Sequence, residues 1–395
     1  MKLKKIFIAS FVTWIVFSCT TEESMQSLIA DRLDRSAEHY RLMAGSLLSQ
    51  PSELPRSFDG EKLATSNSAW WCSGFMPGVL WYLYQYTNDA TFLENAKIYT
   101  GRIEKEQYNR GTHDLGFMLY CSFGNGYRLT GDTAYRSILL TGAESLATRY
   151  HPVTGCIKSW NSNAKWQFPV IIDNMMNLEF LLWASKESGD PKFREICISH
   201  SDRTVKNHFR PDYSSYHVVS YDTVSGQPEK KNTHQGYSDE SAWSRGQAWG
   251  LYGYTVMYRE TKIPAYLEQA KGIAGFILNH PNLPPDKIPY WDFNAPDIPD
   301  ARRDASAGAI IASALVELSA YVDGELSAKY LETAERQIRT LSSPEYFAEK
   351  GTNGNFILKH SVGHLTGKSE VDVPLTYADY YYIEALLRYR DLMRK

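Results

Sequence analysis

The chain carries an internal repeat, and this repeat constrains the fold more than any other feature. The stretch that begins at Trp71 reads W-C-S-G-F-M-P-G, and the stretch that begins at Trp243 reads W-S-R-G-Q-A-W-G. The tryptophan and both shared glycines recur at the same offset. Each stretch is followed by a similar block, F-L-E-N-A-K from Phe92 and Y-L-E-Q-A-K from Tyr266. Self-similarity of this kind indicates an array of equivalent supersecondary units.

Each repeat predicts a helical hairpin. An apolar, aromatic helix comes first, a short polar turn follows, and an amphipathic helix with apolar residues at helical spacing completes the unit. The same pattern recurs along the chain, so we expect six apolar inner helices that begin near 71, 114, 173, 243, 304 and 377. The expected outer helices lie near 28–48, 90–107, 133–150, 191–208, 264–280 and 325–341.

Six inner and six outer helices predict an all-α (α/α)6 toroid. The inner helices are almost wholly apolar because both of their sides would be buried, whereas the outer helices are amphipathic. A length of 395 residues alone would suggest two or three domains. Six hairpins closed into a ring make one catalytic domain over 28–395 instead. The alternatives are an open helical solenoid and a two-domain helical protein.

The lengths of the connections give the barrel two different ends. The turns from inner to outer helices are short, whereas the connections 151–172, 209–242, 281–303 and 342–376 are long. Long loops on a rigid scaffold are where functional sites are built. We call the end that carries them the mouth. The N-termini of the inner helices point to the mouth, and their dipoles favour an anionic ligand there.

The N-terminal segment indicates export. Basic residues at the start precede an apolar run over 6–17, and V-F-S-C ends at Cys19. This arrangement is typical of a lipoprotein signal peptide over 1–18, with a lipidated Cys19 and a short tether over 19–27. It predicts an exported, membrane-anchored lipoprotein at the periplasmic or cell surface. Ordinary secretion is the alternative.

Composition excludes several partners. Lys and Arg number 42 against 45 Asp and Glu, so no basic excess exists to neutralise a nucleic acid backbone. No stretch after the first segment is long and apolar enough to span a membrane. The remaining cysteines form no C-x-x-C pair, which favours four buried thiols over a zinc or redox site. They are Cys72, Cys121, Cys156 and Cys197.

Two aspartates stand where inner helices begin. Asp114 lies in T-H-D-L-G-F and Asp173 in I-I-D-N-M-M-N-L. Either one alone reads as a helix cap, but as a pair on one rim they resemble an acid/base set. The apolar residues before Asp173 favour a raised pKa and therefore an acid role. Asp304 holds a similar position among small residues, which favours a cap.

The densest polar and aromatic segment is 233–250, which reads T-H-Q-G-Y-S-D-E-S-A-W-S-R-G-Q-A-W-G. Arg245 could bind a carboxylate in bidentate fashion, and the indoles of Trp243 and Trp249 could stack on a sugar ring. Core packing is the alternative for Trp249. The chain has no metal-binding H-E-x-x-H, no EF-hand loop, no P-loop and no G-x-S-x-G elbow, so we predict no metal and no cofactor.

These motifs, together with S-Y-H-V-V and E-V-D-V-P-L-T-Y-A-D-Y-Y, resemble glycoside hydrolase family 88. The family comprises unsaturated glucuronyl hydrolases, and the resemblance spans about 70–387. It implies an (α/α)6 fold and a substrate made by polysaccharide lyases, an oligosaccharide with a C4=C5-unsaturated uronate at its non-reducing end. It also implies protonation at C4, addition of water at C5, and collapse of the resulting hemiketal.

The resemblance assigns roles to individual residues. Asp173 would donate the proton and then activate the water, while Asp114 would stay ionised near the ring hydroxyls. Thr233 would touch the next sugar. The walls that stack on the sugar would be Trp71 and Trp160, and the uronate pocket would be lined by His217, Gln235, Trp243, Arg245 and Trp249.

Several questions stay open from the sequence. The segment 359–364 lies where the family distinguishes sulfated from unsulfated substrates, and nothing in it decides the preference. Lys230 and Lys231 could favour sulfate or could form a solvated loop. The nearest alternative function is an unsaturated rhamnogalacturonyl hydrolase acting on pectin fragments. A non-catalytic surface glycan-binding lipoprotein and an epimerase that uses His217 and His234 are the others.

Overall fold

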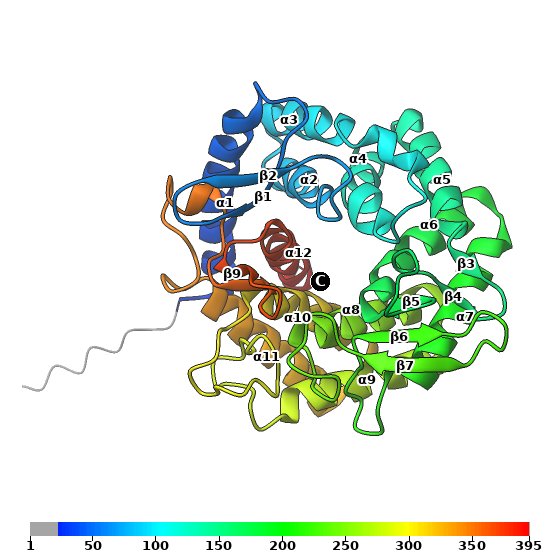
Figure 1. Cartoon of the computed structure of the whole chain (residues 1–395). Helices are drawn as coiled ribbons and strands as arrows, with labels where there is room; N and C mark the ends of the chain where they lie inside the picture. Colours follow the sequence, from blue (N-terminus) through cyan, green and yellow to red (C-terminus); the bar gives the residue numbers. More distant parts are fainter. Residues whose placement is uncertain (1–22, 395) are drawn as a thin grey trace, which may run out of the picture.

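The computed structural model describes residues 23–394, so the predicted signal peptide and Cys19 lie outside the described residues. Two concentric rings of helices enclose one axis (Figure 1). This arrangement confirms the predicted (α/α)6 toroid. The inner ring contains α2 (Phe75–Thr87), η2 (Gly116–Gly124) with α4 (Asn125–Thr130), η3 (Ile172–Asn177) with α6 (Leu178–Ser188), α8 (Ser244–Thr261), α10 (Ala305–Leu318) and α12 (Thr376–Met393).

The outer ring alternates with the inner ring along the chain. It contains α1 (Met25–Leu47), α3 (Ala90–Gly101), α5 (Thr133–Ala147), α7 (Pro191–His208), α9 (Pro264–Asn279) and α11 (Gly324–Leu341). Short 3-10 turns are η1 (Glu104–Tyr108), η4 (Ser319–Tyr321) and η5 (Asn353–Asn355). The inner helix α10 packs against α8, α11 and α12, which explains why nearly all of its side chains are buried and apolar.

The tight turns between inner and outer helices have a local cause. Three inner helices end in a left-handed residue, Asn88, Gly131 or Gly189, and an aspartate follows each one. The side chain of that aspartate accepts a hydrogen bond from the backbone N–H two residues later, at 2.8 to 2.9 Å. The dipeptides N-D and G-D therefore stop one helix and cap the next.

The glycines of the internal repeat lie where inner helices touch. A Cβ atom at Gly74 would stand 2.2 Å from the carbonyl oxygen of Met118 in η2, and one at Gly78 would stand 2.6 Å from that of Cys121. In the second repeat, a Cβ at Gly246 would stand 3.2 Å from Ile172 in η3. Close approach of neighbouring inner helices requires glycine at the tightest of these positions.

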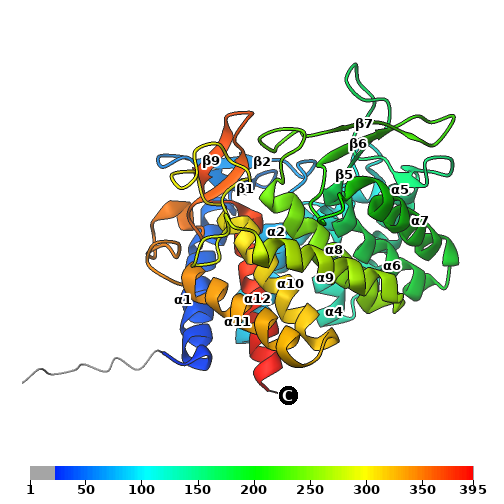
Figure 2. The same cartoon turned by 90° about the horizontal axis from the view of Figure 1, so that it is seen from below.

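Four small antiparallel sheets were not predicted. They are β1 (Leu54–Phe58) with β2 (Leu63–Ser66), β3 (Tyr150–His151) with β4 (Cys156–Ile157), β5 (Pro169–Ile171) with β6 (Val218–Tyr221) and β7 (Pro228–Asn232), and β8 (Ser361–His364) with β9 (Ser369–Val373). Figure 2 shows β1, β2, β5, β6, β7 and β9 at one end of the barrel, the mouth. They form within the long connections, and strands of two to five residues leave too little alternation to be seen in the sequence.

The described chain begins and ends at the other end of the barrel, which we call the far end. Both the start of α1 and the end of α12 lie there (Figure 2). No helix among residues 23–394 is long and apolar enough to cross a membrane. Cys72, Cys121, Cys156 and Cys197 are all buried free thiols, as the sequence indicated.

Candidate active site

A cavity of about 230 Å³ lies at the mouth, between the N-terminal ends of the inner helices and the hairpins that surround them. Six of the predicted site residues line it. They come from the stretches that lead into four different inner segments, so the closed ring is what brings them together. They are Trp71, Asp114, Trp160, Asp173, Gln235 and Arg245.

The other predicted residues lie beside or behind this cavity. Trp243 is buried and its ring stacks on that of His217 at a centroid distance of 4.5 Å. Trp249 is fully buried, so it packs in the core, and its indole lies next to the carboxyl of Asp173. Thr233 does not line the cavity, and its hydroxyl accepts the backbone N–H of Gly236 at 2.8 Å.

Asp173 is the carboxyl best suited to hold a proton. It lies in the 3-10 turn η3, and its side chain caps no helix. Burial raises its pKa from 3.8 to about 7, while the charge of Arg245 opposes that rise and the charge of Asp114 adds to it. Its Oδ2 atom has no hydrogen-bond partner among residues 23–394. The side chain is 13% exposed, so it remains reachable from the cavity.

His217 faces Asp173 in a defined tautomer. The backbone N–H groups of His234 and Gln235 donate to its Nδ1 at 3.1 and 3.0 Å, so the proton of the neutral ring is on Nε2. That Nε2 lies 3.7 Å from Asp173 Oδ2. Burial lowers the pKa of His217 well below its usual value, and the ring is therefore neutral near pH 7. A neutral N–H donor thus stands next to the carboxyl that changes its charge.

Asp114 has a histidine partner of its own. Asn174 donates to the carbonyl oxygen of Ile157 at 2.6 Å, which orients its amide so that Oδ1 faces His113 Nδ1 at 2.9 Å. The amide Nδ2 of Asn177 also lies 3.4 Å from this Nδ1 atom. The opposite nitrogen of the ring, Nε2, lies 3.2 Å from Asp114 Oδ1. Thr112 also donates its hydroxyl to Asp114 at 2.6 Å.

Arg245 is more deeply embedded than the sequence suggested. Its guanidinium donates to Asp304 Oδ2 at 3.1 Å, to the carbonyl oxygen of Val362, and to that of Gly363 at 2.7 Å. Its Nε–H has no partner among the described residues. Asp304 in turn accepts the backbone N–H of Ser306 at 3.0 Å, which confirms that Asp304 caps α10.

Two hairpins supply part of the cavity wall that the sequence did not predict. Arg56 in β1 pairs with Glu370 in β9 at 2.5 Å and lies 4.1 Å over the ring of Trp70. On the other side, His364 at the end of β8 stacks near His234 at 4.7 Å. Glu370, His364 and His234 stood in segments noted in the sequence, whereas Arg56 and Trp70 did not. The strands that carry these side chains were too short to be recognised.

The geometry therefore combines one carboxyl that keeps its proton up to about pH 7, a neutral imidazole donor, a second carboxyl and aromatic walls. Such a set suits protonation of a sugar-like substrate followed by activation of water. Among residues 23–394, no group of three or more His, Cys, Asp or Glu side chains is placed to hold a metal ion.

Comparisons with known proteins agree with this description. The family model Glycosyl Hydrolase Family 88 matches residues 49–391. An unsaturated glucuronyl hydrolase of Formosa agariphila is 47% identical over 327 residues, which are 82% of this chain and 81% of that protein. The crystal structure of an unsaturated glucuronyl hydrolase specific for heparin superposes with a TM-score of 0.91 at 48% identity, covering 94% of this chain and 99% of that one.

A more distant structure contains a substrate-like molecule. It is a variant of an unsaturated glucuronyl hydrolase from Streptococcus agalactiae complexed with dGlcA-GalNAc6S. This structure is 28% identical to the present chain, covers 98% of both chains and gives a TM-score of 0.78.

Proposed function

The chain belongs to glycosyl hydrolase family 88 and is a glycoside hydrolase, and we propose that it releases the C4=C5-unsaturated uronate from the non-reducing end of glycosaminoglycan fragments made by polysaccharide lyases. The observation that carries this proposal is the pair of carboxyls in one cavity, of which Asp173 has a pKa raised to about 7 by burial. A carboxylic acid that is still protonated near neutral pH can deliver a proton to carbon.

In the proposed reaction the C4=C5 double bond is hydrated. Asp173 gives its proton to C4, and the positive charge that develops at C5 is stabilised by the ring oxygen. Asp173 is then a carboxylate and accepts a proton from the water that attacks C5. The product is a hemiketal, which opens to a keto sugar and breaks the bond to the next sugar. Asp173 is protonated again when the cycle ends.

The neighbouring residues support these two charge states of Asp173. The Nε2–H of His217 points toward its carboxyl and stabilises the ionised form between the two proton transfers. Asp114, held by His113 and Thr112, orients the hydroxyl groups of the sugar ring. The free Nε–H of Arg245 is the donor left for the uronate carboxylate, and Trp71 and Trp160 form flat walls for the sugar rings.

The test follows the ultraviolet absorbance of the C4=C5 bond. The protein is incubated with unsaturated disaccharides prepared from heparin, chondroitin, hyaluronan and rhamnogalacturonan, and loss of absorbance is measured. We expect turnover of glycosaminoglycan disaccharides and a deuterium atom at C4 when the reaction runs in heavy water. Faster turnover of the rhamnogalacturonan fragment would assign the chain to pectin degradation. A product without deuterium at C4 would contradict the hydration route.

Loss of turnover in variants separates an enzyme from a glycan-binding protein. Asp173→Asn should lower kcat by a factor of about 10² to 10⁴, the usual contribution of a general acid, while the disaccharide still binds. Asp190→Asn is the matched control, because Asp190 caps α7 in the turn after α6 and does not line the cavity at the mouth. Equal turnover in Asp173→Asn and in the unmodified protein would remove Asp173 from the mechanism.

We also propose that the protein is an exported lipoprotein anchored through Cys19. The support is the sequence pattern over 1–19, together with the position of α1, which begins at the far end of the barrel (Figure 2). An anchor joined there would leave the mouth directed away from the membrane. Cys19→Ala should move the protein from the membrane fraction to the soluble fraction in its native host. An unchanged distribution would refute the anchor.

A further inference from the structure

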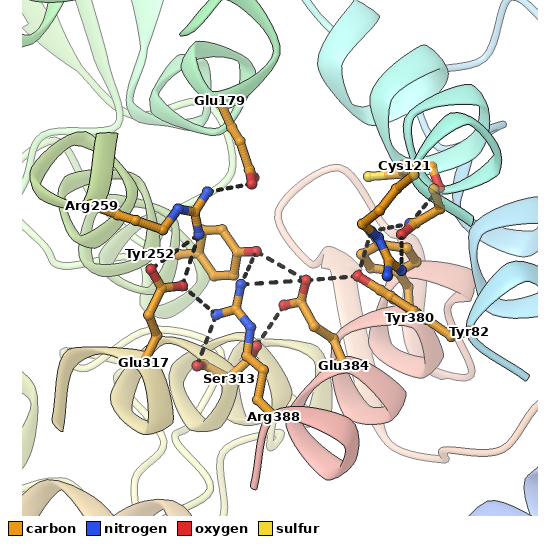
Figure 3. A network of polar contacts seen from close by, with 12 residues as sticks. Tyr82, Cys121, Glu179, Tyr252, Arg259, Ser313, Glu317, Tyr380, Glu384 and Arg388 are labelled. Carbon is orange, nitrogen blue, oxygen red and sulfur yellow. Dashed lines mark hydrogen bonds and ion pairs between the residues drawn. The ribbon is translucent and has the colours of Figure 1, made fainter. Parts of the chain in front are cut away.

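A second cavity, of about 450 Å³, lies at the far end of the barrel axis. Its lining comes from α2, η2 with α4, η3 with α6, α8 and α12, so five of the six inner segments contribute. Figure 3 shows the polar side chains around it. The volume is within the range of small-molecule binding sites and is larger than that of the cavity at the mouth. The proposed hydrolysis uses none of its residues.

A layer of aromatic rings separates the two cavities. Phe117 lines the far cavity and contacts Trp71, which lines the mouth cavity, at a ring distance of 5.5 Å. Phe117 also contacts the buried Trp249 at 5.2 Å, and Tyr381 contacts Trp249 at 5.4 Å. The rings fill the axis between the two ends. The far cavity is therefore a separate compartment and is not an extension of the active site.

The wall of the far cavity contains a network of paired charges. Arg388 pairs with Glu317 at 2.9 Å and donates to the Tyr252 hydroxyl at 2.8 Å, and Glu384 accepts from the hydroxyls of Tyr82 and Tyr252 (Figure 3). These bonds hold the wall rigid. They also leave few charges without partners for an incoming ligand.

The remaining charge on the lining disfavours anions. The lining contains two cationic side chains, Arg128 and Arg388, and three acidic ones, Glu179, Glu384 and Asp391. The balance within the lining is one negative charge, and Arg259 and Arg390, which lie outside the lining, pair with Glu179 and Asp391. Both arginines already bond to side chains of the wall, Arg128 to an amide oxygen at 2.7 Å and Arg388 to Glu317. A uronate or a sulfated sugar would therefore meet repulsion here, in contrast to the mouth, where Arg245 is present.

The lining also contains one hydroxyl without a partner, one carboxyl oxygen without a partner and a flat aromatic surface. The hydroxyl of Tyr120 makes no hydrogen bond to any of residues 23–394. Glu179 bonds to Arg259 through one oxygen only, and its side chain is 25% exposed although it belongs to an inner helix. Trp183 stands next to Tyr120 at a ring distance of 6.0 Å and also lines the cavity. A free acceptor, a free hydroxyl and an indole face are what a sugar ring requires.

From this arrangement we propose that the far cavity binds an amino sugar, a pyranose that carries an ammonium group and neither a carboxylate nor a sulfate. The ring would stack on Trp183, its hydroxyls would bond to Tyr120, and its ammonium group would lie against the free oxygen of Glu179. The net negative charge and the aromatic rings both favour a cation. Sugars of this charge type would be recognised here and acidic sugars at the mouth, so the two compartments would select opposite charges.

The experiment measures binding to the full chain by calorimetry and by saturation-transfer NMR, with no turnover required. The probes are glucosamine, glucose and glucuronate. We expect glucosamine to bind most tightly, glucose more weakly and glucuronate least. Tyr120→Phe should weaken binding of glucosamine and glucose by about two- to tenfold, the effect of one lost hydrogen bond. This variant removes a hydroxyl that bonds to no other described residue, so its folding should be unchanged.

Two further variants locate the ligand. Glu179→Gln should abolish the preference for glucosamine over glucose, and its melting temperature checks that it folds. Trp160→Ala, in the mouth cavity, should leave glucosamine binding unchanged. If Trp160→Ala weakens binding while Tyr120→Phe and Glu179→Gln do not, the sugar occupies the active site and the proposal is wrong. Absence of binding at millimolar glucosamine, or tighter binding of glucuronate, would also overturn it. None of these outcomes depends on whether the hydrolase assay succeeds.

Discussion

Replacement of Asp173 by asparagine should stabilise the protein at alkaline pH while it abolishes activity. The folded protein keeps the Asp173 proton up to about pH 7, whereas an unfolded chain releases it near the ordinary value of 3.8. Between these pH values the folded state binds more protons than the unfolded state. The free energy of unfolding therefore falls as pH rises from about 4 to about 7, and it changes no further above that range. Asparagine has no proton to lose and removes this penalty.

The size of the effect follows from the pKa shift. A rise from 3.8 to about 7 is roughly three pKa units, which corresponds to about 4 kcal/mol at 1.36 kcal/mol per unit. This is an upper value, because asparagine also loses the attraction between the carboxylate and Arg245. An entropy of unfolding of about 2 cal/mol/K per residue gives roughly 0.8 kcal/mol/K for the whole barrel. The variant should then melt up to about 5 °C higher than the unmodified protein at pH 8, and at nearly the same temperature at pH 4.

The assay is calorimetric melting of both proteins at several pH values between 4 and 8. Asp190→Asn is the control, because hydrogen bonds from the backbone N–H of Lys192 lower the pKa of Asp190 and give the opposite sign. Relative to the unmodified protein, that control should be less stable by a small amount that stays the same between pH 4 and pH 8, because the lowered pKa of Asp190 lies below this range. If Asp173→Asn melts at or below the temperature of the unmodified protein at pH 8, then Asp173 is not a strained, protonated acid, and the assigned mechanism loses its basis. The pH dependence of kcat is a second test of the raised pKa, since activity should decline as pH rises through about 7.

Three further predictions concern the framework of the site. Arg245→Met should lower the free energy of unfolding by about 3 to 5 kcal/mol in denaturant titrations, because it leaves the buried Asp304 carboxylate without its cation. The double variant with Asp304→Asn should recover part of this loss. Gly74→Ala should lower the free energy of unfolding by about 1 to 3 kcal/mol or more, because the new methyl group meets backbone oxygens of the next inner helix. Gly45 has open space around it, so Gly45→Ala should leave the free energy of unfolding unchanged or raise it in the same titrations. Trp160→Ala should raise KM more than it lowers kcat in steady-state assays, since Trp160 lines the cavity and we propose that its ring stacks on the sugar away from the reacting atoms.

The helical framework could be predicted from the sequence because its signals are repeated and local. Three of the turns between an inner and an outer helix can be recognised from a dipeptide such as Gly131-Asp132, and the inner segments are apolar enough to be recognised as buried helices. The repeated glycines and tryptophans then indicated that the hairpins are equivalent units of one ring. Asp114 and Asp173 could be found by the same reasoning, since both stand at the start of an inner segment.

The part that escaped prediction depends on contacts between distant segments. Arg56 and Glu370 meet only because the β1–β2 and β8–β9 hairpins lie on the same part of the mouth. The tautomer of His217 depends on two backbone N–H groups from a loop 17 and 18 residues away. The hydrogen bonds from Arg245 to Asp304 and to the backbone of β8 could not be predicted either, since each of these partners lies 59 or more residues away in the sequence. Local sequence patterns do not predict contacts between residues that are so far apart in the sequence.

Three aspartates stand at the start of inner segments, and the structure explains why they differ chemically. Asp304 precedes a regular α-helix, whose first free N–H groups come within reach and turn its carboxyl into a cap. Asp173 lies inside a 3-10 turn that continues directly from β5, where its carboxyl caps no helix and lines the cavity instead. Asp114 is held by a histidine and a threonine instead of by a helix. An unsatisfied, buried carboxyl has a raised pKa, so the departure from ordinary helix geometry after β5 is what converts a potential cap at Asp173 into an acid.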